Sequence, residues 1–260
     1  MTITLVSLLV LGFFVFLYGL SGLSEQRAQS VLYKTFAGEL SQAVAPTGPT
    51  TEGAPVAILD IPAIGIHDLV VVEGTTAGDL THGPGHVPAT VLPGQYGVSV
   101  IYGRTATYGG PFAHLMQLQR GEKITVTTGQ GIATYIVESF GRSGSPTPDT
   151  TANRLILETG NSSNYTSGWA QVSADLWSSP QQTPTSWPAV TAQELALAGD
   201  PNALIPTVLW CQALLLVFLG GALAAHYWSR WAALLCSVPI ALALVWCVYE
   251  NLSLLLPNLY

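Results

Sequence analysis

Long apolar runs lie at both ends of the chain, whereas the middle alternates between apolar and polar positions. The first run, residues 3–20, carries no charged side chain, and two further runs cover residues 204–225 and 231–256. A run of about 18 to 20 apolar residues is long enough for a helix to cross a bilayer. We therefore expect one N-terminal and two C-terminal transmembrane helices.

Between these runs, residues 56–177 contain short β-branched segments that follow a period of two and are separated by Gly, Pro and Asn. These segments are Val70–Val72, Val98–Ile101, Lys123–Thr128, Ala133–Phe140 and Arg154–Glu158. Alternation of this kind is typical of half-buried strands. A domain of about 120 residues can also bury a core without help. We predict a mainly β fold for this region, either a sandwich or a barrel.

Two less apolar segments connect the β region to the membrane runs. After an anchor at residues 1–23, residues 24–55 begin with Ser24 as an N-cap and end in a linker rich in Pro, Gly and Thr. The first part predicts a helical stalk, whose apolar stripe we expect to pack against neighbours of the first helix. The stripe consists of Ala28, Val31, Leu32, Phe36 and Leu40. Residues 178–203 predict a second linker, which we expect to lie against the membrane face.

Two interpretations of the first apolar run remain open. A cleaved signal peptide usually has a positively charged start and a small-residue cleavage site, and here only the loose cluster Gly19–Ser24 resembles such a site. An uncleaved signal anchor is therefore favoured. The loop between the last two runs carries Arg230, with Trp228 and Trp231 suited to the membrane interface. A cytoplasmic loop would place the N-terminus in the cytoplasm and the β region outside, with Glu250 at the outer interface or paired.

Composition agrees with a membrane protein and gives no reason to expect nucleic-acid binding. Only 9% of the residues are charged and the mean hydropathy is +0.42, as expected when three segments are apolar. The net charge is −7 and the eight Lys and Arg residues form no basic run, so we expect no nucleic acid partner. No Cys or carboxylate lies at metal-ligand spacing from a His, and we expect neither a metal nor a cofactor.

Several motifs of the β region occur in the order and spacing of one known family. They are AILDIPAIGI at Ala57–Ile66, the stretch Asp79–Phe112 with its strand VSVI and loop YGRTATYGG, and the segment Pro111–Val137. Together they resemble the sortases, cysteine transpeptidases of the bacterial cell envelope, and most closely the class E and class D-like members. The resemblance implies a closed β-barrel outside the plasma membrane of a Gram-positive bacterium, with a groove for an extended peptide.

The resemblance also implies three catalytic residues, a His, a Cys and an Arg, and the matching positions hold other side chains. Arg104 stands at the His position and Gly160, after Thr159, stands at the Cys position. Trp169, or a near neighbour, stands at the Arg position. The three cysteines, Cys211, Cys236 and Cys247, all lie in the C-terminal apolar runs. A thiolate nucleophile must be accessible and near a base, so we expect a pseudoenzyme without catalytic residues.

A substitute nucleophile is the alternative. Thr159, Ser162 or Ser163 flank the vacant position, and His86 would have to act as the base. A hydroxyl needs a closely placed base and an oxyanion site, and Arg104 cannot accept a proton. His82 and His86 lie in a turn-rich segment, which is more typical of exposed structural histidines than of a catalytic base.

The favoured function is a non-catalytic binding or scaffold subunit of a membrane or envelope assembly. Its groove would be wider than in active relatives, because Gly160 has no side chain. The expected groove residues are His86, Arg104, Tyr108, Thr159 and Gly160. The expected partners are other membrane proteins, an extended peptide of a surface protein, and the lipid bilayer. Small residues from Gly220 to Ala225 would permit close helix contact. A third hypothesis makes the β region a mere spacer for the membrane hairpin.

Overall fold

The computed structural model describes residues 2–142, 153–160, 168–184, 187–227 and 230–260. The chain forms two compact units, of which the first comprises Met1–Ala198 with Pro257–Tyr260 and the second comprises Gly199–Leu256. The last four residues therefore belong to the first unit, although the second unit precedes them in sequence.

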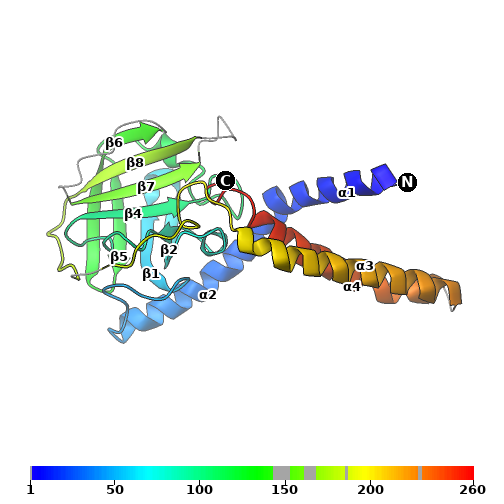
Figure 1. Cartoon of the computed structure of the whole chain (residues 1–260). Coiled ribbons are helices and arrows are strands. Elements are labelled where there is room, and N and C mark those ends of the chain that lie inside the picture. The colour runs from blue at the N-terminus through cyan, green and yellow to red at the C-terminus, as the bar shows by residue number, and fades with distance from the viewer. Residues whose placement is uncertain (1, 143–152, 161–167, 185–186, 228–229) are drawn as a thin grey trace. The chain divides into compact units, whose positions relative to one another are not determined.

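The first unit is built around a closed barrel of eight strands in the order β1-β2-β3-β4-β7-β8-β6-β5 (Figure 1). The strands are β1 (Pro55–Ile61), β2 (Ile66–Glu73), β3 (Gly85–His86), β4 (Val98–Gly103), β5 (Lys123–Thr128), β6 (Gly131–Arg142), β7 (Arg154–Gly160) and β8 (Trp169–Leu176). Short 3₁₀ turns lie at Pro62–Ile64, Asp79–Thr81 and Leu115–Gln117. The predicted mainly β fold with a closed barrel is confirmed.

Alternating side chains explain why these segments become strands of a barrel. In β4 and β5 every second residue is buried, as expected when one face of a strand points into the core. The inward residues form one cluster that includes Leu59, Ile101, Val126, Leu157 and Val172. Burial of this cluster removes apolar surface from water and is the main force that holds the barrel together.

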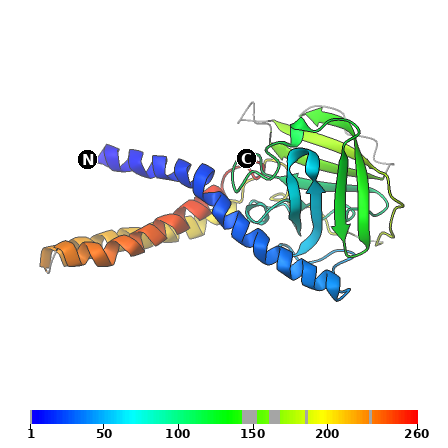
Figure 2. The same ribbon diagram turned by 180° about the vertical axis from the view of Figure 1, so that it is seen from behind.

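A long helical segment precedes the barrel: α1 (Thr2–Val15), a π-helical turn (Phe16–Leu20) and α2 (Ser21–Ser41). Figure 2 shows α2 alongside β1 and β2. The side-chain amide of Gln29 accepts from Val70 N at 2.8 Å and donates to Val70 O at 2.9 Å, as a neighbouring strand would. Phe36 is fully buried against Ile58 and Val70. The expected packing of the stripe against neighbours of the first helix is wrong, because its buried members contact the barrel; Val31 is exposed.

The segment after β8 also contacts the barrel. Gln181 N donates to Gly94 O at 2.7 Å, Trp187 packs against the core cluster, and Thr75 Oγ1 donates to Glu194 O at 2.7 Å. We expected this linker to lie against the membrane face. In the structure it packs on the barrel instead, because its polar backbone groups find hydrogen-bond partners there.

The second unit contains a 3₁₀ turn (Pro201–Ala203) and two helices, α3 (Leu204–Tyr227) and α4 (Arg230–Ser253). A Cβ atom placed on Gly221 would lie 3.2 Å from Ser237, so at least one of the small residues serves contact between α3 and α4. Glu250 accepts a hydrogen bond from Trp246 Nε1 at 2.8 Å within α4. Cys211 and Cys236 are exposed, and Cys247 is half-buried.

Three helical segments among the described residues are long and apolar enough to cross a membrane: Ser7–Ser41, Pro201–Tyr227 and Arg230–Ser253. They correspond to the three runs expected from the sequence. The first segment is longer than a bilayer requires, and its C-terminal part is the portion of α2 that contacts the barrel.

Candidate functional site

The positions that the family resemblance assigns to the catalytic His, Cys and Arg meet where β4, β7 and β8 lie side by side. Strands β4 and β7 are parallel, with Gly103 opposite Thr159, so the residues that follow both strands emerge at one edge of the barrel. Strand β8 runs antiparallel to β7 and places Trp169 opposite Gly160. Arg104, Gly160 and Trp169, which are far apart in sequence, therefore share one site.

Arg104 is buried, with 1% of its surface exposed, and is anchored by backbone oxygens. Its Nε donates to Leu80 O at 3.0 Å and its Nη2 donates to Ala77 O at 2.9 Å. Its Nη1 donates to Thr107 Oγ1 and to the main-chain oxygen of Tyr260, both at 3.1 Å. Burial lowers the pKa of the guanidinium to about 10, so Arg104 stays protonated at neutral pH and cannot act as a base.

No Asp or Glu side chain within the described ranges forms an ion pair with Arg104. The Tyr108 ring lies below the guanidinium, 4.9 Å from Arg104 Cζ to the ring centroid, and this cation–π contact favours the charged form. Tyr108 is itself buried and has a positive φ of 50°. Its backbone N donates to Ser21 Oγ of α2 at 2.9 Å, which connects the loop after β4 to the N-terminal helix.

The hydroxyl groups beside Gly160 bond to one another and to backbone rather than to a base. Thr159 Oγ1 donates to Gly103 O at 2.8 Å. Thr105 Oγ1 lies 2.8 Å from Thr159 Oγ1 and donates to Gly160 O at 2.7 Å. Among the described residues, no imidazole is hydrogen-bonded to either threonine hydroxyl, so no general base from that part of the chain contacts them.

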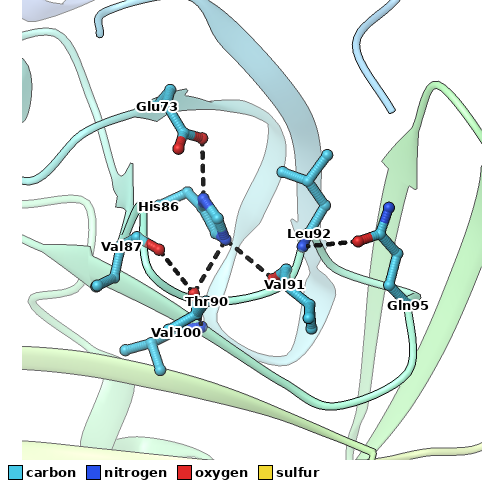
Figure 3. Close-up of polar contacts among 8 residues, drawn as sticks. All are labelled: Glu73, His86, Val87, Thr90, Val91, Leu92, Gln95 and Val100. Atoms are coloured by element: carbon cyan, nitrogen blue, oxygen red, sulfur yellow. Dashed lines mark hydrogen bonds and ion pairs between the residues drawn. The ribbon is translucent and has the colours of Figure 1, made fainter. Parts of the chain in front are cut away.

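His86, the proposed substitute base, is fully buried on β3 and engaged on both ring nitrogens (Figure 3). Nδ1 lies 2.9 Å from Glu73 Oε2, and Nε2 lies 2.9 Å from Val91 O and 3.1 Å from Thr90 Oγ1. A carbonyl only accepts, so Nε2 carries a proton, and the contact with Glu73 is either an ion pair or a shared proton. The expectation of an exposed loop histidine is wrong for His86, because Glu73 and the Val91 carbonyl provide buried partners.

The remaining sequence-predicted residues have other positions. His82 is exposed at the end of a 3₁₀ turn, and its carbonyl accepts from Gln29 Nε2 at 2.8 Å. Ser162 and Ser163 lie outside the described residues. Glu158 precedes Thr159 and therefore faces the other side of β7. Burial raises the pKa of its carboxyl group to about 7, with Tyr102 as its neighbour on β4.

Sequence reasoning missed the residues that occupy the site. The main-chain oxygen of Leu259 accepts from Thr105 N at 3.0 Å, and Tyr260 contacts Arg104 and Thr107. The expected wide groove at Gly160 is wrong, because Leu259 and Tyr260 fill that space. The only signal in the sequence was a polar Asn258 and an aromatic Tyr260 after Pro257, at the end of an apolar run.

Comparisons with known proteins show which protein domains the barrel is similar to. Residues 59–167 match the family model of the sortase domain. The solved structure of a Clostridium perfringens sortase D5 transpeptidase is 23% identical, covers 58% of this chain and 99% of its own, and has a TM-score of 0.51. Sortase E from Streptomyces avermitilis is 29% identical over 50% of this chain and 91% of its own, with a TM-score of 0.44. No curated protein matches the chain.

Proposed function

We propose that the protein is a non-catalytic, membrane-anchored member of the sortase family, whose domain model residues 59–167 match, and that it acts as a binding or scaffold subunit. The observation that carries the proposal is the set of side chains at the joined ends of β4 and β7. Arg104, Thr105, Thr159 and Gly160 include no thiol and no imidazole. Acyl transfer through a thioester needs both a nucleophilic sulfur and a proton acceptor.

Two further observations support the loss of catalysis. Every cysteine of the chain lies in α3 or α4, outside the barrel domain. His86 makes its hydrogen bonds with Glu73, Thr90 and Val91 rather than with Thr159 or Thr105. A hydroxyl whose hydrogen bonds all go to other hydroxyls and to carbonyls has no route for proton removal, so Thr159 lacks the activation that a substitute nucleophile requires.

Turnover measurement tests this proposal. We expect the full chain in detergent micelles to release no product from a peptide that the Streptomyces avermitilis sortase E cleaves, with or without hydroxylamine as acceptor. Hydroxylamine traps any acyl-enzyme as a hydroxamate, whichever side chain carries the acyl group, and mass spectrometry detects the product. Sortase E is the positive control. Hydroxamate formation that disappears in Thr159→Ala, Ser162→Ala or His86→Gln would establish the substitute-nucleophile enzyme instead.

The proposal includes a topology in which the barrel lies outside the plasma membrane and the N-terminus lies in the cytoplasm. It rests on the three helices that could cross a membrane and on Arg230 between the last two. In a variant without the native cysteines, Tyr96→Cys offers a probe, since Tyr96 is 61% exposed on the barrel. We expect a membrane-impermeant maleimide to label this cysteine in intact cells. Labelling only after the cells are permeabilised would reverse the orientation.

A further inference from the structure

The segment Pro257–Tyr260 follows the last helix of the second unit in sequence, yet it is embedded in the barrel unit. Asn258 and Leu259 have no exposed surface. Figure 1 marks the end of the described chain at the edge of the barrel. Pro257 and Tyr260, on either side of this buried pair, are half-buried. The segment must be held by specific contacts, because a short segment without such contacts would remain solvated.

Asn258 anchors the start of this segment. Its backbone N donates to Ala198 O at 2.9 Å. Its side-chain Nδ2 donates to Thr75 O at 2.8 Å and to Leu195 O at 3.1 Å. These carbonyls belong to the loop after β2 and to the linker that covers the barrel. An amide side chain with two donors suits this pair of acceptors, and an aspartate would not.

Leu259 and Tyr260 then enter the site itself. Leu259 O accepts from Thr105 N at 3.0 Å and lies 3.2 Å from Thr105 Oγ1, whose single proton is shared with the nearer Gly160 O. The main-chain oxygen of Tyr260 accepts from Arg104 Nη1 at 3.1 Å and from Thr107 Oγ1. The Tyr260 hydroxyl donates to Gly168 O, the residue before β8, at 3.2 Å. Residues of the loop after β4 thus donate hydrogen bonds to main-chain oxygens of the segment, as they would to those of a bound peptide.

Gly160 connects this occupancy to the missing nucleophile. A Cβ atom placed on Gly160 would lie 2.8 Å from Leu259 O, 3.0 Å from Thr105 Oγ1 and 3.1 Å from Tyr260 Cδ1. The nearest of these distances is shorter than Cβ contacts in real structures. A side chain at position 160 and the segment therefore compete for the same volume, and the absence of a side chain creates the room that Leu259 and Tyr260 use.

We propose that the site is a binding cleft for the chain's own Pro257–Tyr260 segment, held by Arg104 and Thr105, and that an external peptide enters only after this segment leaves. The inference deepens the proposed function and rests on it, since it names the occupant of a cleft taken to be non-catalytic. A ligand that belongs to the same chain has a high effective concentration at the cleft. Modest contacts therefore suffice to keep an external peptide out.

Thiol labelling tests occupancy directly. In the full chain with Cys211, Cys236 and Cys247 replaced by alanine, Thr105→Cys places a thiol under the segment. We expect its maleimide labelling in nanodiscs to be at least tenfold slower than in the same chain shortened after Leu256. Tyr96→Cys in both backgrounds is the control and should label at one rate. Equal labelling of the cysteine at position 105 in the two chains would overturn the proposal.

Two point substitutions repeat the test without shortening the chain. Leu259→Asp should speed labelling of the position-105 cysteine as the deletion does, since a carboxylate cannot remain in this buried place. The matched change Leu259→Met should leave labelling slow. If Leu259→Asp labels as slowly as Leu259→Met, the segment is not what covers the cleft. Thermal melting of each variant verifies that the barrel remains folded.

Competition tests whether the cleft recognises this sequence. A peptide with the sequence Leu-Pro-Asn-Leu-Tyr, added to the shortened chain at millimolar concentration, should slow labelling again, and a scrambled peptide should not. Absence of protection by either peptide would overturn sequence recognition. Gly160→Ala should lower the melting temperature of the full chain more than that of the shortened chain, in which only the contact with Thr105 Oγ1 remains. The failure of these experiments is distinct from product formation in the turnover assay, which would overturn the non-catalytic function instead.

Discussion

Replacement of Arg104 by methionine is expected to destabilise the barrel by about 2 to 6 kcal/mol, because it leaves two buried carbonyl groups without donors. The change removes four hydrogen bonds and leaves the carbonyls of Leu80 and Ala77 buried without donors. Each unsatisfied carbonyl costs about 1 to 3 kcal/mol. The expected fall in melting temperature of the detergent-solubilised chain is about 10 °C, which scanning fluorimetry measures.

Arg154→Met is the matched control for that experiment. Arg154 makes an ion pair with Asp175 at 2.8 Å, but the two side chains are 18% and 46% exposed. Partly exposed ion pairs contribute about 0 to 1 kcal/mol, so this variant should melt within a few degrees of the parent. Similar melting temperatures for the Arg104 and Arg154 variants would mean that the buried guanidinium is not a structural anchor.

Arg104 matters for function because of the acceptors to which its guanidinium donates. At the position that the family resemblance assigns to a base, this chain has a side chain that can only donate. Three of its acceptors, Leu80 O, Ala77 O and Thr107 Oγ1, lie in the segments that follow β2 and β4, and the fourth is the main-chain oxygen of Tyr260. Arg104 thus connects the loop after β2, the loop after β4 and the C-terminal segment. A histidine is too short to make these four contacts.

Strands such as Lys123–Thr128 could be predicted from the sequence because their burial alternates strictly. Strand β8 was missed, because its run of buried residues has no such alternation. Strand β3, only Gly85–His86, is too short to show any period. The packing of α2 was also hidden, because Gln29 imitates a strand's hydrogen bonds with a side chain. Propensity and periodicity describe local preference, and neither reports which distant backbone a side chain will meet.

Part of the candidate site could likewise be predicted from the sequence, and part could not. Arg104 and Gly160 could be located from motifs, since Arg104 directly follows strand β4 and Gly160 is the last residue of β7. The occupant could not, because Pro257–Tyr260 is four residues long and is separated by more than 90 residues from most of its partners. Burial of His86 depended on Glu73, which pairs with it across β2 and β3 in a parallel register that sequence alone does not fix.

The buried pair of His86 and Glu73 is expected to show a large coupling free energy. Their side chains are 0% and 2% exposed, and Nδ1 lies 2.9 Å from Oε2. Removal of one partner, in His86→Leu or Glu73→Leu, leaves the other polar group buried without its partner and should cost about 3 to 5 kcal/mol. The double variant removes both groups, so it should be more stable than the sum of the single changes predicts. Urea unfolding of the four proteins in detergent measures the cycle.

His114→Leu is the control for the His86 cycle, since His114 is exposed and its ring hydrogen-bonds to the exposed side chain of Gln117. His114→Leu should change the free energy of unfolding by no more than about 0.5 kcal/mol relative to the parent. Additive costs for His86→Leu and Glu73→Leu would contradict the coupling and leave His86 free for another role. A large coupling instead assigns the imidazole to the structure: its Nδ1 is held by Glu73 and its Nε2 by Val91 O, so no ring nitrogen is left to take a proton from Thr159.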